Sequence, residues 1–148
     1  MRNKLFNTPF ELSLHVVLLL DMVDVGITLD RIAAYDFIAI YCEDFGFANK
    51  SLNGENGFAF SELSTKRNLI KKAIKDLVVD GLVTVSDSNV GILYSISEIG
   101  RKMSTSLQSE YAMKYKELMC LIVERYRDYK DVQLLNEISR QAAKSLRR

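Results

Sequence analysis

The chain has 148 residues, of which 48% are hydrophobic and 26% are charged. A chain of this size buries about two-thirds of its unfolded surface, so its folding does not require a disulfide or a metal, and a single domain over residues 1–148 is expected. The formal net charge of +1 excludes a uniformly basic, DNA-coating protein, although residues 1–60 carry a net charge of −4 and residues 101–148 a net charge of +5.

The first predicted helix begins at Pro9 and runs to about Val23, with Gly26 ending it. Thr8 can cap this helix by accepting a hydrogen bond from the amide of Glu11, and proline is favoured at the first helical position. Its apolar residues leave almost no polar face, and they are Leu12, Leu14, Val16, Val17, Leu18, Leu19 and Leu20. A helix that is apolar all round is either central in the core or covered by a partner.

The second predicted helix extends from about Leu29 to Phe45 and is capped by Thr28. Its apolar stripe is formed by Ile32, Ala33, Phe37, Ile40 and Tyr41. The helical pattern places three acidic residues outside this stripe, and they are Asp36, Glu43 and Asp44. An irregular segment rich in glycine and asparagine follows over residues 46–57. It lacks the glycine–lysine spacing of a phosphate-binding loop, so nucleotide binding is not expected.

Residues 58–102 follow the order of a winged helix, which is helix, strand, turn, strand, helix. A short strand over residues 58–60 is predicted to precede a helix that runs from Ser64 or Thr65 to Val79. Asp80 and Gly81 end that helix, because glycine suits the left-handed position after a helix. The two wing strands are predicted at 82–85 and 92–96, with a turn around residues 87–91. The fold class is therefore α+β and mainly helical, with a winged-helix core, a two-stranded wing and two preceding helices.

The C-terminal part, residues 104–148, is predicted to be helical. Ser97 can cap a helix whose first turn is interrupted by Gly100 and which continues to about Tyr129; a last helix covers residues 131–146. Residues that step by three or four positions form a tyrosine-rich seam on the long helix, and its candidate partner-interface residues are Tyr111, Tyr115, Ile122, Tyr126 and Tyr129. This tyrosine seam packs either on the body of the protein or against another chain.

The helix of the predicted winged-helix core carries five basic residues, which are Lys66, Arg67, Lys71, Lys72 and Lys75. They are candidates for reading a DNA groove, for contacting phosphates without reading bases, or for a face that is solvated or turned to a partner protein. Two features favour the last two interpretations. The wing tip has no lysine or arginine, and residues 60–64 leave no room for a short helix supporting a recognition helix.

Catalysis is the least supported class of function. His15 is the only histidine and lies in the most apolar helix, so a structural or interface role is favoured over a general base. Cys42 and Cys120 do not have zinc-site spacing with it, and reduced, largely buried thiols are expected instead of a disulfide or a nucleophile. No cofactor or metal is expected. The apolar run from Val16 to Leu20 is too short to span a bilayer, so a cytoplasmic protein without a membrane partner is expected.

Several short motifs resemble, in order, those of one protein family. They are Phe6–Glu11, Leu18–Asp21, Leu29–Asp30, Tyr35–Phe37, Ser51–Leu52, Ser61–Leu63, Lys66–Ile70, Gly81–Val83, Gly91 with Tyr94, Ser97–Glu98 and Ser109–Tyr111. Together they span about residues 5–130, and the ordered set resembles the middle component (type 2) of ABC-three-component systems.

The resemblance implies a winged-helix accessory subunit that acts beside an SMC- or Rad50-like ABC ATPase and a nuclease-type effector. It further implies Lamassu-type defence against phages and plasmids, with DNA contacted, if at all, through the assembled complex. The residues alone leave a second hypothesis open: a dimeric winged-helix DNA-binding transcriptional regulator, with the tyrosine seam as its dimer helix and the basic helix at the DNA.

Overall fold

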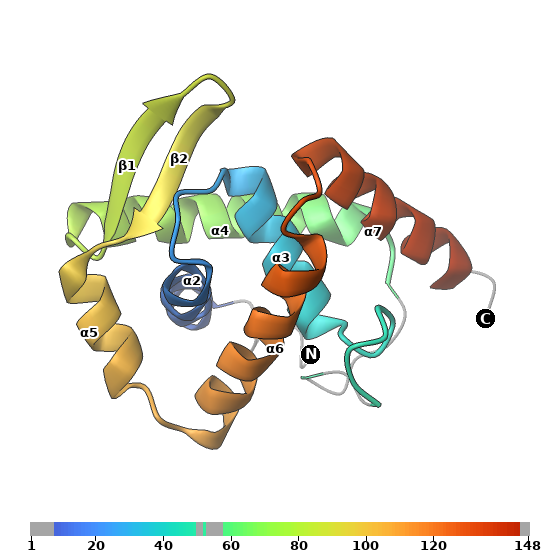
Figure 1. The fold of residues 1–148 in the computed structure, drawn as a ribbon, viewed down its shortest axis with the longest axis horizontal. Helices are drawn as coiled ribbons and strands as arrows, with labels where there is room; N and C mark the ends of the chain where they lie inside the picture. The colour runs from blue at the N-terminus through green and yellow to red at the C-terminus, as the bar shows by residue number, and fades with distance from the viewer. Residues whose placement is uncertain (1–7, 50–51, 53–57, 146–148) are drawn as a thin grey trace.

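The computed structural model describes residues 8–49, 52 and 58–145 (Figure 1). In these residues six helices and one two-stranded sheet follow each other along the chain, which confirms the prediction of a mainly helical α+β protein. The helices are α2 (Pro9–Val23), α3 (Leu29–Ile40), α4 (Ser61–Val79), α5 (Glu98–Ser106), α6 (Glu110–Tyr126) and α7 (Asp131–Ser145), and the strands are β1 (Val83–Ser88) and β2 (Gly91–Ile96).

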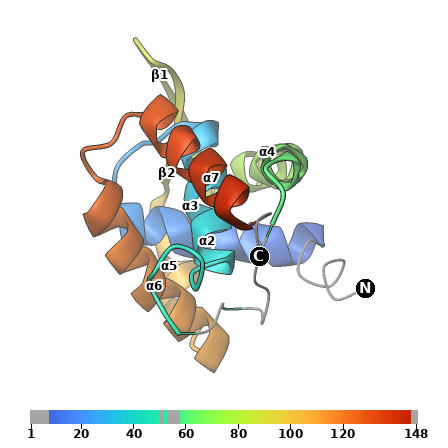
Figure 2. The ribbon, with the colours of Figure 1, turned by 90° about the vertical axis from the view of Figure 1, so that its right-hand side faces the viewer.

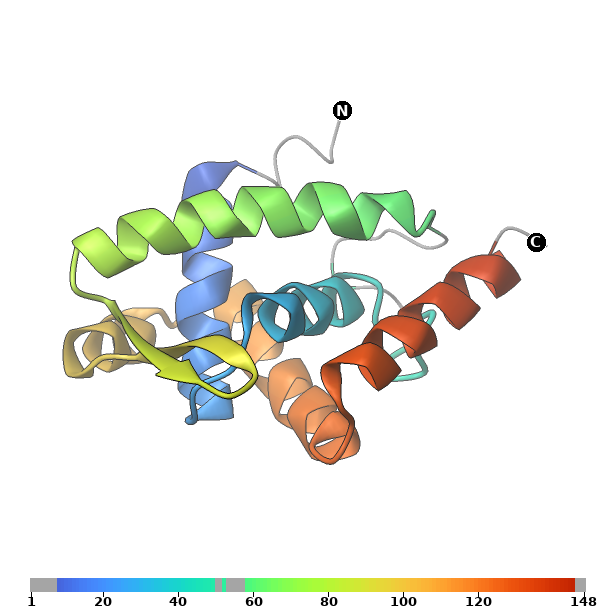
Figure 3. The same cartoon turned by 90° about the horizontal axis from the view of Figure 1, so that it is seen from above.

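Helix α2 is the central helix of the core. It is capped as predicted, because the Thr8 side chain accepts a hydrogen bond from the amide of Glu11 at 3.2 Å and Pro9 occupies the first turn. It contacts α3, α4, α5, α6 and β2, so the prediction that it is buried on most sides is confirmed (Figure 3). The helix ends at Val23 as predicted, but the residue that terminates it in a left-handed conformation is Asp24, with a φ of 60°, and not Gly26.

Helix α3 begins as predicted, with the Thr28 hydroxyl accepting a hydrogen bond from the amide of Arg31 at 3.2 Å. It ends at Ile40, five residues before the predicted end, and a series of turns follows. The Phe58 ring then packs at 4.9 Å from the rings of both Phe37 and Tyr41. These aromatic contacts hold residues 58–60 as an irregular segment, so the short strand predicted there is wrong.

Helix α4 begins at Ser61, three to four residues earlier than predicted, and it crosses α2 and packs against α3 (Figure 3). The expectation that α4 lacks a supporting helix is wrong, because α3 packs against it. The sequence did not indicate this arrangement, because residues 41–60 separate α3 from α4 where a helix-turn-helix has a short turn.

Strands β1 and β2 form the predicted antiparallel hairpin, which projects from the helical body (Figures 1 and 2). Val85 lies opposite Tyr94 in its register, and the turn falls at Asn89 and Val90. The segment before α3 adds to this sheet, because Ile27 and Tyr94 exchange two backbone hydrogen bonds of 3.0 and 2.8 Å. The hairpin is thereby tied to the α2–α3 connection.

The long helix predicted after Ser97 is two helices. Ser97 caps α5 as predicted, with its hydroxyl accepting from the amide of Gly100 at 2.9 Å, but Gly100 lies within the helix and does not interrupt it. A side chain at Gly100 would collide with the carbonyl oxygen of Leu82 at the base of the hairpin, so glycine permits this close approach. The helix is interrupted at residues 107–109. Ser109 caps α6, with its hydroxyl accepting a hydrogen bond from the amide of Ala112 at 3.1 Å.

Candidate interaction face

The five basic residues predicted on α4 divide between two sides of the helix. Lys66 is only 8% exposed and points into the core, while Arg67 is half-buried and pairs with Asp30 at 2.5 Å. The other three residues are exposed and form no ion pair with a described residue; they are called the basic face here and are Lys71, Lys72 and Lys75. The structure therefore retains three of the five as surface groups.

Lys66 belongs to a buried polar cluster centred on Asp36, which is 1% exposed. The Asp36 Oδ1 atom accepts a hydrogen bond from the Tyr115 hydroxyl at 2.6 Å and one from His15 Nδ1 at 3.0 Å. The Lys66 Nζ atom lies 3.2 Å from the other carboxylate oxygen, in an ion pair whose geometry is not that of a hydrogen bond. The Tyr111 hydroxyl extends the cluster by lying 3.3 Å from His15 Nε2. The cluster thus connects α2, α3, α4 and α6.

Burial and neighbouring charges shift the pKa values of the groups in this cluster, and at Asp36 the two effects oppose each other. Burial alone would raise the pKa of Asp36, but the Lys66 ammonium and the His15 ring beside it, with hydrogen bonds from His15 and Tyr115, hold that pKa well below its usual range. Burial, and then the adjacent carboxylate, raise the pKa of the Tyr115 hydroxyl well above its usual value. Asp36 is therefore a buried carboxylate compensated by a lysine, and this pairing fixes α4 on α3.

The prediction that Asp36 and Asp44 lie outside the buried stripe of the second helix is wrong, because they are 1% and 9% exposed. A signal for Asp36 was present, since it follows Ile32 by four positions and precedes Ile40 by four, which places it on the apolar stripe. The identity of its cationic partner carried no comparable signal, because Lys66 lies thirty positions away on another helix.

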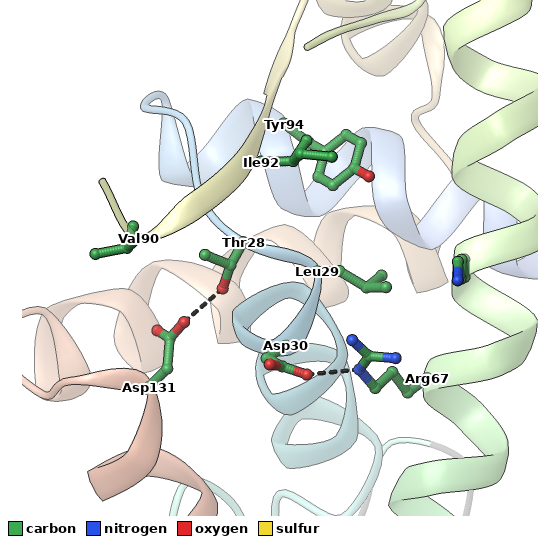
Figure 4. Close-up of a pocket in the computed structure, with 9 residues that line it drawn as sticks. Thr28, Leu29, Asp30, Arg67, Val90, Ile92, Tyr94 and Asp131 are labelled. Carbon is green, nitrogen blue, oxygen red and sulfur yellow. Dashed lines mark hydrogen bonds and ion pairs between the residues drawn. The ribbon is translucent and has the colours of Figure 1, made fainter. Parts of the chain in front are cut away.

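A groove of about 310 Å³ runs between α4 and the hairpin over the start of α3 (Figure 4). Its floor is held by polar contacts, among them a 2.6 Å hydrogen bond from the Thr28 hydroxyl to Asp131 and the Asp30–Arg67 pair. The Tyr94 ring points from the hairpin toward α4 across this space. Among the residues of the basic face, only Lys71 lines the groove, beside Val90, Ile92 and Tyr94.

The hairpin beside this groove exposes three apolar side chains and has no basic residue. Val90 is 75% exposed, and Val85 and Ile92 are each 48% exposed. Asp87 is the only charged residue between Val83 and Ile96. A hairpin that contacts nucleic acid phosphates benefits from a lysine or arginine near its tip, so this hairpin is better suited to a protein surface.

The tyrosine seam packs mainly on the body of the protein. Three of its residues are buried on α6, and they are Tyr115, Ile122 and Tyr126. Tyr111 is half-buried beside His15, and Tyr129 alone is exposed, with 37% of its surface accessible. The sequence left open whether this seam faces the body or another chain, and the structure places most of it in the core.

Arg31 connects the C-terminal end of α6 to the following helix, α7. Its guanidinium lies 2.8 Å from Asp131 at the start of α7 and donates hydrogen bonds to the backbone carbonyls of Tyr126 and Tyr129. The side chain is 11% exposed. Arg31 therefore caps the C-terminal end of α6 and positions α7 against α3.

The described residues contain no group of three or more histidine, cysteine, aspartate or glutamate side chains that could hold a metal ion. The expectation of largely buried thiols holds for Cys42, which is buried, but not for Cys120, which is exposed; both cysteines are free. None of the described helices is both long enough and apolar enough to cross a membrane.

Comparison with known proteins found one family. A search of curated proteins and a search of solved structures each gave no match. The model of the ABC-three component system Middle Component 2 family matches residues 5–148, which is nearly the whole chain. The match covers all the described helices and the hairpin. The chain therefore belongs to the Middle Component 2 family of ABC-three component systems.

Proposed function

We propose that this chain is a non-catalytic accessory subunit that binds an SMC- or Rad50-like ABC ATPase in the cytoplasm. In this role it helps to assemble a Lamassu-type complex that acts against phages and plasmids and contains a nuclease-type effector. The observation that carries the proposal is the family match over residues 5–148, because it includes the whole folded body and assigns the chain to a system with other components.

The order of elements supports a winged-helix body for this subunit. A helix (α2), a bridging strand residue (Ile27), two helices (α3 and α4) and a two-stranded hairpin follow each other, and Ile27 pairs with the second strand of the hairpin. In such a body α4 takes the position of the recognition helix and the hairpin that of the wing. The wing without a basic residue and the inward-facing Lys66 favour a winged helix used for protein docking over one that reads bases.

Co-purification with the ATPase component of its own system tests the proposal. We expect the two proteins to elute together at micromolar concentration after nuclease treatment has removed DNA. A defence assay in cells completes the test, because deletion of this chain should abolish defence by the system. Separate elution, combined with defence that does not depend on this chain, would refute the proposal.

A second candidate function is sequence-independent DNA contact within the assembled complex. The observation that favours it is the basic face of three exposed lysines without a described ion partner. Reversing the charges of Lys72 and Lys75, which do not line the groove beside the hairpin, should weaken DNA binding by the complex and leave assembly intact. Unchanged DNA binding would exclude these two lysines as contacts.

The alternative of a dimeric DNA-binding regulator is tested by a mobility shift of the isolated chain on its own promoter. A sequence-specific complex that survives about 150 mM salt would favour the regulator, because sequence-independent phosphate binding weakens steeply with salt. The burial of Tyr115, Ile122 and Tyr126 counts against this alternative, since it removes most of the proposed dimer surface.

A further inference from the structure

The groove between α4 and the hairpin has two cationic side chains on its α4 wall. Arg67 and Lys71 are four positions apart, so they lie one turn apart on the same side of α4, and both line the groove. Figure 4 shows the Arg67 guanidinium directed from α4 into this space. Lys72 and Lys75, the other residues of the basic face, lie outside the lining, so the groove includes only one edge of that face.

The hydrogen-bond donors of the groove are only partly used. Arg67 donates to Asp30 through its Nε atom at 2.5 Å, and its two Nη groups have no hydrogen-bond partner among the described residues. Within this part of the chain the same holds for the Lys71 ammonium and for the Tyr94 hydroxyl, which points toward α4 from the hairpin (Figure 4). The groove therefore presents three groups that can donate hydrogen bonds to an oxyanion.

The two acidic residues of the groove lining are each paired with an arginine. Asp30 pairs with Arg67 at 2.5 Å, and Asp131 pairs with Arg31 at 2.8 Å. Lys71 is the remaining charged residue of the lining, and it forms no ion pair with a described residue. An occupant with a negative group is therefore favoured, because a neutral or cationic one would remove water from the ammonium without compensating its charge.

The hairpin wall of the groove is apolar. Val90 and Ile92 line it with 75% and 48% of their surfaces exposed, and the half-buried Leu29 lines the groove at the start of α3. An apolar side chain of the occupant would remove this surface from water. The two walls together match a peptide in which an acidic side chain lies beside a large apolar one.

Duplex DNA matches this arrangement less well. A sugar–phosphate backbone can accept hydrogen bonds from the α4 wall, but it offers no large apolar group to cover Val90 and Ile92. Asp87 would repel it, and the hairpin has no basic residue to offset that repulsion. A protein segment is favoured because it brings a carboxylate and an apolar side chain together.

We propose that the groove between α4 and the hairpin binds a segment of a partner protein in which an aspartate or glutamate lies next to a large apolar residue. The carboxylate of this segment accepts hydrogen bonds from Arg67, Lys71 and Tyr94, and its apolar side chain covers Val90 and Ile92. This inference rests on the proposed function, because it takes the partner to be the ABC ATPase component.

Zero-length crosslinking of the full-length chain in complex with its ATPase tests the occupant directly. A carbodiimide joins a lysine amine to a carboxylate only where the two are in contact, and mass spectrometry then identifies both residues. Lys71 should be joined to an aspartate or glutamate of the ATPase that has a large apolar neighbour. Lys72 and Lys75 are internal controls, because they are exposed on the same helix but lie outside the groove lining, and they should remain largely unjoined to the ATPase.

Matched variants measure the two walls separately. Lys71→Glu should weaken ATPase binding about tenfold or more, whereas Lys72→Glu should change it much less. Tyr94→Phe removes only the hydroxyl and should weaken binding about threefold to tenfold. On the hairpin wall, Val90→Ser should weaken binding about fivefold. Val79→Ser is its control and should leave binding unchanged, because this valine is 84% exposed on α4 and lies outside the groove.

The outcomes separate this inference from the proposed function. A complex in which Lys71 is not joined to the ATPase, and which Lys71→Glu and Val90→Ser form with wild-type affinity, would overturn the groove as the docking site and leave the accessory role standing. Crosslinks from Lys71 to another copy of this chain would identify self-association. Lys71→Glu that weakens binding of duplex DNA by the complex but not binding of the ATPase would identify nucleic acid; either result would also overturn the inference. Failure of the wild-type chain to bind the ATPase would refute the proposed function itself, and with it the partner assigned to the groove.

Discussion

Lys66 Nζ lies 3.2 Å from Asp36 Oδ2, and both side chains are almost fully buried. The pair joins the helix that carries the basic face to the helix beneath it. A lysine that the sequence makes a candidate for DNA or phosphate contact is thereby a stabilising element of the core. Removing one member of a buried ion pair leaves the other charge uncompensated, so this relationship has measurable consequences.

Replacing Lys66 with methionine should lower the free energy of unfolding by about 3–5 kcal/mol, because Asp36 would remain buried without its cation. Lys71→Met is the matched control on the exposed side of the same helix, and its effect should stay within about 0.5 kcal/mol. Urea denaturation followed by circular dichroism measures both. Equal free energies of unfolding for the two variants would contradict a stabilising role of the Lys66–Asp36 pair.

The stability of the protein should fall in acid partly because of Asp36. Its pKa in the folded protein is well below its unfolded value near 3.8, so the unfolded state binds the proton more readily. The contribution of Asp36 is fully present above the unfolded pKa and is lost as the pH falls below it toward the folded pKa. Asp36→Asn should therefore flatten the decline in unfolding free energy between pH 5 and pH 2, measured by denaturant titration at each pH, relative to wild type. A variant with the same decline as wild type would contradict this assignment.

Gly100→Ala should destabilise the contact between α5 and the base of the hairpin. The added methyl group would collide with the carbonyl oxygen of Leu82, and the expected loss is about 3 kcal/mol because backbone is hard to displace. Gly26→Ala is a graded control, since its methyl group would meet only the Leu93 side chain at 3.1 Å and should cost less. The melting temperatures of the two variants test the prediction. A lower melting temperature for Gly26→Ala than for Gly100→Ala would contradict it.

Arg31→Lys should release α7 without unfolding the rest of the protein. Lysine cannot hold Asp131 and the two carbonyls at the end of α6 at once, and the expected loss in local stability is about 1–3 kcal/mol. Faster amide exchange confined to α7 and the end of α6 is the expected observation. Arg127→Lys is the control, because its only described ion partner is the exposed Glu124; exchange that is equally fast in both variants would contradict the capping role of Arg31.

The parts of the fold that the sequence predicted are those set by neighbouring residues. Thr8, Thr28 and Ser97 each precede a helix and accept the expected amide, because a capping signal acts within three positions. The two strands of the hairpin were predicted for the same reason, since β-branched runs and a turn are local signals. The break before α6 also had a local signal, Ser109 followed by Glu110, but the regular spacing of the tyrosine seam across it favoured one continuous helix.

The parts that the sequence could not predict depend on which elements meet. The exposure of Lys71, Lys72 and Lys75 follows from the apolar face on the other side of α4 and was predictable. The burial of Lys66 was not, because it requires Asp36 of another helix to lie opposite. In the same way, only the packing of α6 on α2 and α3 decides that Tyr115 and Tyr126 belong to the core.

The central claim is that this chain is a protein-binding accessory subunit and not an independent reader of DNA. Analytical ultracentrifugation of the full-length chain, mixed at micromolar concentration with the DNA-free ATPase of its system, tests the claim most directly. The account predicts a single faster-sedimenting species that contains both proteins. Two separately sedimenting proteins, together with specific binding of the isolated chain to its own promoter, would contradict it.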